Sequence, residues 1–482
     1  MNEKFRSVIS HSSDDKVKIV YSWHGPKGPV WNTELPNILA MSSVAEGVNP
    51  HMTSRNFWTD DMWTKLFSRQ DDLYEQVPAQ YIEFDDKRPF LYPFSLTWRV
   101  PFETYFCGNS GIIEFSHMPH WLLHLCRTAN GYILIDHSVE AFMSTSELSA
   151  MYAYFHHCHH VPMYKIIYLT GTVNAEAVYD SWAKQHNVPD DPDHRMKVIP
   201  YASSREIFSS YLKHGDNEGT LDTDEDYDVN HVPSKLFLSW NRRFRQHRII
   251  LALILEKLNV VERSLISFPK NNVERLTDSF IHNVENLDQP VTVYGHHAYQ
   301  FEQEEINRFD MRLPLVIDGE TDINKMCEDF GFTREHYKNT LVSIVTETNF
   351  DAVECTLTEK SFKPILHKHP FIIVGVPGAL RGLRDLGFKT FGEFWNESYD
   401  DTQSPGDRMI RISNIISEIA LWDENKIRDF RQKVKPILEH NYNLLKVPGS
   451  ILIVNKIYNH ITDHFESEEH HATCHQVRCH AG

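Results

Sequence analysis

The stretch LVSIVTETNFDAVECTLTEKSFKPILHKHPFIIVGVPG, residues 341–378, decides the fold that this sequence predicts. The run Leu341–Val345 is short, apolar and β-branched, which is typical of a buried strand. Thr358 is an expected N-cap for a helix that begins at Glu359. A second buried strand follows at Phe371–Val374. A strand, a helix and a strand in this order predict a parallel sheet with a crossover connection.

The polar residues of this stretch lie where such sheets bind ligands. Glu347 follows the first strand, and Glu359 and Lys360 begin the helix. Ligands of open α/β sheets lie beyond the carboxyl ends of the strands, and a helix N-terminus favours an anion. Because a carboxylate repels phosphate, we assign sugar or ribose hydroxyls to Glu359 and the phosphates to Lys360 and the backbone. The alternative is that both are ordinary first-turn residues of a solvated helix.

Four pieces of this stretch together resemble the donor-binding motif of α1,3-fucosyltransferases. In chain order they are Glu347-Thr348-Asn349, Leu357-Thr358-Glu359-Lys360, Phe362 and Pro370–Gly375. The chain is also similar to uncharacterised glycosyltransferase-like proteins of phages and large DNA viruses, which carry a similar TEK-x-FKP-I, PFI-x-x-G-x-PG and LR-x-LGFKTF. It departs from the fucosyltransferases in having Thr348-Asn349 for their usual Asn-Ser, a difference that concerns the sugar more than the fold.

The resemblance implies a GT-B glycosyltransferase, an α/β protein with two Rossmann-like domains facing a cleft. The C-terminal domain would bind a nucleotide-diphosphate sugar, such as a GDP-fucose-like donor, through Glu347, Asn349, Glu359 and Lys360. The reaction would be inverting, and the acceptor would be a hydroxyl group, such as one on a glycan. Fixed cations can replace a divalent metal, and the nucleotide sugar is a substrate, so we expect neither a metal nor a cofactor.

A basic segment follows the first strand of the second half. The predicted strand Lys235–Trp240 is followed directly by NRRFRQHR, residues 241–248, and then by an apolar helix. Arginine side chains match phosphate oxygens in a bidentate manner, and the helix N-terminus adds its dipole. We assign the diphosphate to Arg242 and Arg245, and we expect Arg248 to point elsewhere on the helix. The alternative is a surface basic patch or a set of salt bridges to acidic segments.

The first half of the chain alternates predicted strands with predicted helices. Buried strands are expected at residues 16–23, 132–136, 165–169 and 196–200, and helices at residues 144–155 and 175–186. This order predicts a Rossmann-like domain. Residues 40–110 are rich in aromatic side chains, which we expect to pack in the core. An aromatic-lined acceptor pocket is the alternative.

Three polar residues follow the expected strand at residues 132–136, at the edge of the sheet where ligands bind. They are Asp136, His137 and Glu140. A carboxylate there can act as the general base that deprotonates an acceptor hydroxyl. We choose Glu140 for this role, because we expect Asp136 to be tied to the end of the strand. The alternative is a loop cap or a solvated charge.

Two segments rich in histidine raise the question of a metal site. The segment His156–His160, HHCHH, fits no standard spacing of structural zinc ligands, and a cationic helix end is the alternative. The tail from His464 to Gly482 carries further histidines and cysteines at irregular spacing. We expect that tail to be a disordered end or an appended artefact, and we predict no metal ligands in the chain.

Composition limits the class of protein. The 482 residues are enough for two or three domains, and 41% of them are hydrophobic, which supports a sizeable core. The net charge of −18 disfavours a general electrostatic grip on nucleic acid. Seven cysteines, an odd number scattered through the chain, predict a reducing compartment.

No segment of the sequence predicts attachment to a membrane. The N-terminal MNEKFRSVISHSSDDK lacks the apolar core of a signal peptide. No run reaches the ~18 apolar residues that a spanning helix needs. Golgi-type fucosyltransferases carry a membrane anchor, so we expect this protein in the cytoplasm instead, which for a viral protein is the host cytoplasm.

A polar, acidic segment predicts the division into domains. Residues 214–230, HGDNEGTLDTDEDYDVN, have the composition of a linker. We expect an N-terminal acceptor-side domain, a C-terminal donor-binding domain, and a last helix with its tail, at residues 1–228, 232–445 and 446–482. The second domain is expected to hold a late strand at residues 388–391 and helices at residues 409–421 and 425–443. The resemblance implies that the last helix crosses back to the first domain.

Two other functions remain open. One keeps the chemistry but makes nucleic acid the acceptor, as in phage DNA glucosylation, and the acidic charge balance speaks against it. The other is a non-catalytic nucleotide-sugar-binding or structural protein that keeps the fold without turnover.

Overall fold

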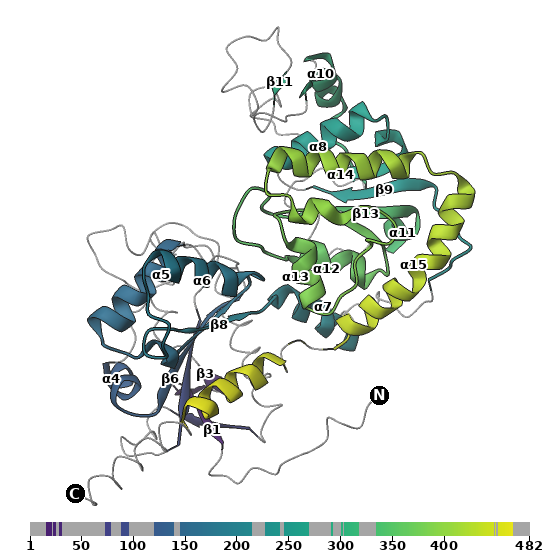
Figure 1. The fold of residues 1–482 in the computed structure, drawn as a ribbon. Helices are drawn as coiled ribbons and strands as arrows, with labels where there is room; N and C mark the ends of the chain where they lie inside the picture. The colour runs from purple at the N-terminus through teal and green to yellow at the C-terminus, as the bar shows by residue number, and fades with distance from the viewer. Residues whose placement is uncertain are drawn as a thin grey trace, which may run out of the picture. The chain divides into compact units, whose positions relative to one another are not determined.

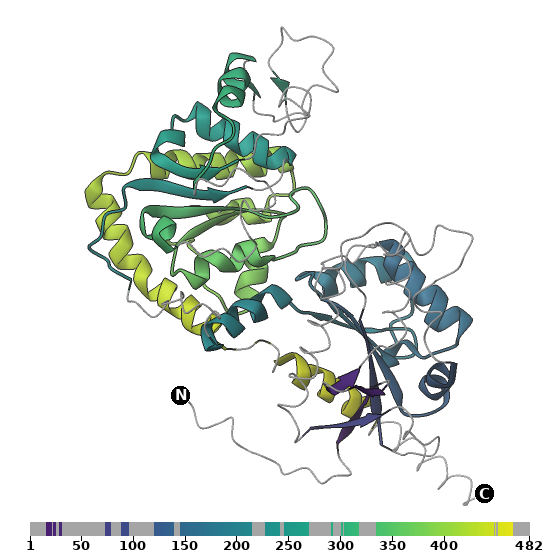
Figure 2. The same cartoon turned by 180° about the vertical axis from the view of Figure 1, so that it is seen from behind.

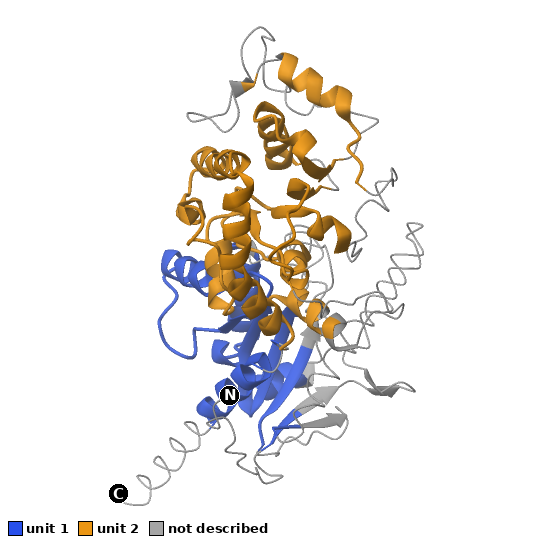
Figure 3. Cartoon of the chain, turned by 90° about the vertical axis from the view of Figure 1, so that its right-hand side faces the viewer, with its two compact units in different colours: residues 1–201, 449–482 blue, residues 202–448 orange. Residues whose placement is uncertain are grey.

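Two α/β units, each built on a sheet of parallel strands, make up the described part of the chain (Figure 1). The first unit comprises residues 1–201 and 449–482, and the second comprises residues 202–448 (Figure 3). The computed structural model describes residues 16–21, 23–25, 28–30, 73–78, 88–95, 120–138, 145–214, 227–241, 245–268, 291–292, 300–301, 303–317, 334–447, 449 and 452–465.

The sheet of the first unit has six parallel strands. Their spatial order is β4-β1-β5-β6-β7-β8. The bounds are β1 (Val17–Tyr21), β4 (Tyr74–Pro78), β5 (Phe90–Ser95), β6 (Gly131–His137), β7 (Ile166–Thr170) and β8 (Lys197–Pro200). The strands predicted at residues 132–136, 165–169 and 196–200 are confirmed. After β1, the short strands β2 (Trp23–Gly25) and β3 (Gly28–Val30) form an antiparallel pair.

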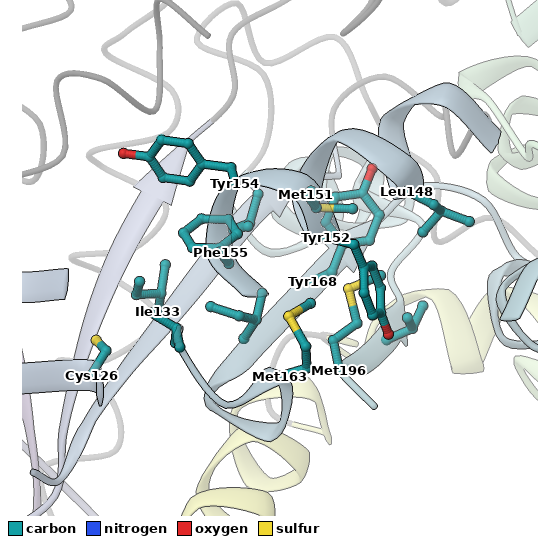
Figure 4. Close-up of a cluster of buried hydrophobic side chains, with 14 of the residues drawn as sticks. Cys126, Ile133, Leu148, Met151, Tyr152, Tyr154, Phe155, Met163, Tyr168 and Met196 are labelled. Carbon is teal, nitrogen blue, oxygen red and sulfur yellow. The ribbon is translucent and has the colours of Figure 1, made fainter. Parts of the chain in front are cut away.

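Both faces of this sheet are buried, and successive side chains of β6 go to opposite faces. Ile133 and Ile135 belong to a core shared with the helices α4 (His120–Thr128), α5 (Thr145–Met151) and α6 (Ala175–Gln185). Figure 4 shows Ile133 and Phe155 in this core together with three methionines. A π-helix, η6 (Tyr152–Cys158), directly continues α5.

The helix at residues 452–465 belongs to the first unit, as the resemblance implied. Its buried residues Ile453, Ile457 and Ile461 share a core with Tyr132 and Leu134, and this core is separate from the one that contains Ile133 and Ile135. Tyr74 Oη also donates a hydrogen bond to the carbonyl of Val454 at 2.7 Å. The chain therefore returns to its first sheet after it has completed the second unit.

The sheet of the second unit has four parallel strands in the order β10-β9-β13-β14. Their bounds are β9 (Lys235–Trp240), β10 (Ser264–Ser267), β13 (Thr340–Thr346) and β14 (Phe371–Val374). The strands predicted at residues 235–240, 341–345 and 371–374 are confirmed. From β9 the chain passes to β10 on one side, and it later returns to β13 on the other side. The strand order thus reverses between β9 and β13, which makes this position a topological switch point.

Helices cover both faces of this sheet. Figures 1 and 2 show α8 (Gln246–Lys257) and α14 (Pro405–Ala420) on one face and α12 (Glu359–Leu366) on the other. The other helices of the unit are α7 (Ser203–His214), α10 (Gln303–Arg312), α11 (Arg334–Lys338), α13 (Ala379–Asp385) and α15 (Glu424–Leu445), with 3₁₀ turns η8 (Val261–Arg263) and η10 (Glu397–Asp401). A short antiparallel pair, β11 (Val291–Thr292) and β12 (Gln300–Phe301), completes the described elements of this unit.

The boundary between the units lies before α7, whereas the sequence placed it at residues 228–232. α7 packs on α12 and α15 of the second unit. The buried guanidinium of Arg205 in α7 donates to the carbonyls of Leu444 and Val447, each at 3.1 Å. The acidic composition of residues 214–230 therefore marked a connection within the second unit.

The prediction of a strand at residues 388–391 is wrong. Gly387, with φ of +90°, ends α13, and the amide of Phe388 folds back to the carbonyl of Leu383 at 3.0 Å. The amide of Phe391 is bound by the carboxylate of Glu397 at 2.7 Å. Because these amides are already paired, the segment is a loop, and Phe388 and Phe391 pack in the core from that loop.

No helix in the described ranges is both long and apolar enough to cross a membrane. α15 has 22 residues, but it carries charged side chains along its length.

The packing of residues 452–465 on the first sheet can be tested with a substitution that creates a cavity at this contact. Ile457 is fully buried, so Ile457→Ala should lower the free energy of unfolding by about 2–5 kcal/mol. The control is Lys456→Ala at the neighbouring exposed position, which should change the free energy of unfolding by less than about 0.5 kcal/mol. Urea denaturation of both variants measures the difference, and equal small effects would contradict the assignment.

Candidate functional site

Three helices of the second unit begin at the same edge of its sheet. α8 follows β9, α12 follows β13 and α13 follows β14. Because the strands are parallel, all three N-termini lie at the carboxyl edge. Each N-terminus has backbone N–H groups without a partner inside its helix and carries positive partial charge. The group that satisfies each N-terminus decides which of them is open to a ligand.

The N-terminus of α12 is served by the buried carboxylate of Glu347. Its Oε1 accepts from the amide of Thr358 at 3.1 Å and from Ser361 Oγ at 2.6 Å. Its Oε2 accepts from Thr358 Oγ1 at 2.6 Å and from the amide of Thr348 at 3.3 Å. The sequence predicted that Glu347 binds the donor, and the structure gives its carboxylate four protein donors. This side chain fastens the end of β13 to the start of α12.

The neighbouring strand leaves little room beside this carboxylate. A Cβ on Gly375, just after β14, would lie 3.4 Å from Glu347 Cβ and 3.3 Å from Ile373 Cγ2. Such contacts are tight, so the glycine allows the end of β14 to approach Glu347. This close approach gives a physical reason for the glycine in the segment Pro370–Gly375.

Glu359 and Lys360 pair with each other at the start of α12. Lys360 Nζ lies 2.6 Å from Glu359 Oε1 and 3.1 Å from Thr358 Oγ1. Burial raises the pKa of Glu359, but the charge and hydrogen bond of Lys360, with the charge of Lys363, lower it by more. The net pKa is therefore below its ordinary value. This pairing favours the alternative that both are first-turn residues of the helix.

The N-terminus of α13 is also satisfied from within the protein. The buried carboxylate of Asp400 accepts from the amides of Leu380 at 2.8 Å and Arg381 at 2.9 Å. Its backbone carbonyl accepts from the amide of Gly378 at 2.8 Å. An internal anion thus holds this helix start.

The N-terminus of α8 is different, because the side chain of its N-cap residue makes no capping hydrogen bond and its first turn has no acidic residue. Its N-cap is the exposed Arg245. A pocket of about 230 Å³ lies beside it, at the switch point between β9 and β13. The pocket is lined by Arg245, Gln246, His247, Thr348, Asn349, Phe350 and Asp351. The structure thus brings together Arg245 and Asn349, which were both predicted to bind the donor, whereas Lys360 is not among the lining residues and Arg242 lies outside the described residues.

A buried histidine forms part of this pocket. His247 Nε2 lies 3.0 Å from the carbonyl oxygen of Glu347, and its ring stacks on Phe350 with centroids 5.4 Å apart. Burial, followed by the charges of Arg248, Arg245 and Arg408, lowers the pKa of His247 to about 3, against a weaker opposing effect of the hydrogen bond to Glu347. The ring is therefore neutral at pH 7.

A second buried residue, Arg408 of α14, also contacts the ring of Phe350. Its guanidinium carbon lies 4.2 Å from the ring centroid, and it donates hydrogen bonds to the carbonyls of Phe350 and, at 2.7 Å, Thr402. Arg408 therefore fixes the loop that forms one wall of the pocket. No local sequence pattern predicts this contact, because Arg408 follows Phe350 by 58 residues.

The two strands beside the pocket are tied at their carboxyl ends. Thr346 Oγ1 donates to Asn241 Oδ1 at 2.8 Å, and the amide of Asn241 binds Ser267 Oγ of β10 at 3.0 Å. Buried Arg248 donates to the carbonyls of Thr346 and Glu347, each at 3.3 Å. Arg248 is thus bound to the end of β13, and these hydrogen bonds connect β9, β10, β13 and α8 beside the pocket.

The residues predicted to act in the first unit are only partly described. Asp136 Oδ1 accepts from the amide of Ser138 at 3.0 Å, so Asp136 is tied to the end of β6, as expected. His137 is buried and its Nδ1 lies 2.8 Å from Tyr168 Oη. Glu140, the proposed base, lies outside the described residues.

The histidine-rich segment of the first unit contains ring contacts. His156 lies 5.0 Å from His194 between ring centroids, and His194 Nδ1 is 2.7 Å from Asp191 Oδ1. Across the described residues, no group of three His, Cys, Asp or Glu side chains is arranged to hold a metal ion. The tail after residue 465 lies outside them.

No protein-family model matches the chain, and no curated protein matches its sequence.

The role of Glu347 as a fastener can be measured with a double-mutant cycle. Glu347→Gln should lower the free energy of unfolding by about 2–4 kcal/mol, since hydrogen bonds to a buried charge are lost. Combined with Ser361→Ala, the two effects should be non-additive by about 1 kcal/mol. Exposed Glu418→Gln is the matched control and should change little. Additive effects would argue against the bond between Glu347 and Ser361.

The pairing of Glu359 with Lys360 predicts a dependence on pH. The pKa of Glu359 is lower in the folded state than its ordinary value of 4.5, so its stabilising effect is present above that value and is lost as the pH falls through the folded-state pKa. In urea denaturation, wild type and Glu359→Gln should therefore differ at pH 7, and the difference should shrink as the pH falls below 4.5. A difference that stays constant or grows toward acid pH would contradict this.

Proposed function

We propose that the protein is a glycosyltransferase of the GT-B type that transfers a sugar from a nucleotide-diphosphate donor to a hydroxyl acceptor. The observation that carries the proposal is the pocket at the switch point between β9 and β13. This is where open α/β sheets bind nucleotides. Of the three helix N-termini at that edge, the one beside the pocket begins with a cation and has no acidic residue in its first turn, and the exposed Asp351 also lines this pocket.

In this proposal the donor diphosphate lies against Arg245 and the first amides of α8. As the bond from the anomeric carbon to the phosphate oxygen breaks, negative charge grows on the departing diphosphate. A fixed guanidinium and a helix N-terminus stabilise that charge without reorganising. Asn349 also lines the pocket and can bind a hydroxyl of the donor.

The rest of the reaction follows from the resemblance to fucosyltransferases. The acceptor hydroxyl attacks the anomeric carbon from the face opposite the diphosphate, which inverts its configuration. Its proton passes to a base, for which Glu140 is our candidate. A GDP-fucose-like donor, a glycan acceptor, a reaction without a metal ion and a cytoplasmic location belong to the same proposal.

This proposal changes the roles that the sequence predicted for Glu347 and Lys360. Glu347 orders the site instead of touching the donor, because four protein hydrogen bonds occupy its carboxylate. Lys360 is already paired with Glu359, so a ligand phosphate would have to replace that partner. We therefore assign the main electrostatic contact to Arg245.

The proposal can be tested by ligand binding and turnover. A thermal-shift screen with GDP, UDP, CMP and dTDP should identify a nucleotide that raises the melting temperature. Incubation with the corresponding nucleotide sugar should then release the nucleotide, through transfer or slow hydrolysis. Binding without any release would favour the non-catalytic alternative, and absence of binding would refute the donor site.

The contribution of Arg245 should be visible in the affinity for that nucleotide. Arg245→Met should weaken binding by about 1.5–3 kcal/mol, roughly 10- to 150-fold, because a charge-assisted hydrogen bond is lost. The matched control is Arg428→Met on α15, a similarly exposed arginine that does not line the pocket. Isothermal titration calorimetry measures both constants. Equal affinities for wild type and Arg245→Met would contradict the assignment.

A further inference from the structure

We infer that Nδ1 of His247 accepts a hydrogen bond from a hydroxyl group of the ligand, beside an oxyanion held by Arg245 and the N-terminus of α8. The inference rests on the proposed function and adds the chemical class of the ligand to it. The pocket would select a phosphorylated compound whose hydroxyl lies next to the phosphate. Ribose or the transferred sugar of a nucleotide donor can supply that hydroxyl.

The bond on the other ring nitrogen fixes the proton of His247. Nε2 faces the carbonyl oxygen of Glu347 at 3.0 Å, and a carbonyl can only accept, so Nε2 must carry the hydrogen. In the neutral ring Nδ1 then has a lone pair and no hydrogen. Within the described part of the chain, no hydrogen bond is made by Nδ1. His247 is only 5% exposed, yet it lines the pocket.

The surroundings of the ring keep this nitrogen an acceptor. Burial, together with the charges of Arg248, Arg245 and Arg408, lowers the pKa of His247 and favours the neutral ring at pH 7. A lone pair repels phosphate oxygens, which at this pH are acceptors as well, but it attracts an O–H or N–H donor. Arg245 and His247 therefore divide the ligand between them: the cation takes the anionic group and the imidazole takes the hydroxyl.

The imidazole is also held in place before any ligand arrives. Its ring is stacked on Phe350 with 12° between the planes, and the guanidinium of Arg408 also lies over the Phe350 ring. Nε2 of His247 is hydrogen-bonded to the backbone carbonyl of Glu347. The position of Glu347 is fixed in turn by the hydrogen bonds that its carboxylate accepts. A site ordered in this way loses little entropy on binding, which favours selectivity for the hydroxyl.

Two substitutions separate the two nitrogens of the ring. His247→Gln places an amide near the position of Nε2 and can keep the bond to the Glu347 carbonyl, but it removes the acceptor at Nδ1. His247→Asn places an amide oxygen near the position of Nδ1 and removes the Nε2 donor. Both variants lose the stacking on Phe350. A difference between them therefore reports the polar atom, and thermal unfolding checks that each one folds.

The probes are pyrophosphate, GDP, 2′,3′-dideoxy-GDP and GDP-fucose, and the matching uracil series with UDP-glucose, titrated by calorimetry at pH 7. Pyrophosphate has no hydroxyl of this kind, so wild type and both variants should bind it within about twofold. The ligand with the recognised hydroxyl should bind His247→Gln more weakly than His247→Asn, by about 2- to 12-fold, the contribution of one hydrogen bond. If that difference is present for GDP or UDP and disappears with the dideoxy analogue, the ribose supplies the hydroxyl. If it is present only for the nucleotide sugar, the transferred sugar does.

Three results would overturn the inference. Equal binding of a nucleotide or nucleotide sugar to His247→Gln and His247→Asn would show that Nδ1 is not used. An equal loss for pyrophosphate in His247→Gln would place the histidine at the anion. In both cases the proposed donor site would survive, because wild type still binds. If wild type binds none of the probes, the donor site and this inference fail together.

Discussion

One residue, Glu347, joins both helices that flank the switch point of the second sheet. Its buried carboxylate accepts hydrogen bonds from Thr358 and Ser361 at the start of α12. Its backbone carbonyl accepts hydrogen bonds from His247 and Arg248 of α8. A charge buried in this way is stable only while its hydrogen bonds are satisfied, so the loop and both helices must keep one geometry. The shape of the pocket depends on this constraint.

The same sheet edge shows how a protein can reserve one helix start for a ligand. Asp400 satisfies α13 and Glu347 serves α12, so the positive ends of these two helices already face anions. α8 begins instead with Arg245, a cation next to a positive helix end, which is an unfavourable pairing in the absence of an anion. A phosphate group would relieve that repulsion. The local electrostatic conflict is the reason that we place the diphosphate here.

Much of the fold could be predicted, because the strands of both sheets are buried on two faces and therefore read as apolar runs. The N-cap Thr358 was predicted correctly, since a side-chain cap is a local feature. The boundary before α7 was not, because the buried face of α7 is completed by α15, more than 200 residues later. The strand predicted at residues 388–391 failed because apolar composition cannot tell a strand from a loop whose amides bind a carboxylate. At the site, Arg245 and Asn349 came from local patterns, whereas His247 and Arg408 act through contacts that only the folded chain creates.

The return of residues 452–465 to the first sheet has a consequence for synthesis on the ribosome. The apolar face that carries Tyr132 and Leu134 lacks its cover until the last part of the chain has been translated. The second unit, residues 202–448, is continuous in sequence and can complete its core before the first unit does. A nascent or prematurely terminated chain therefore presents an open hydrophobic sheet, a surface that chaperones recognise and that promotes aggregation.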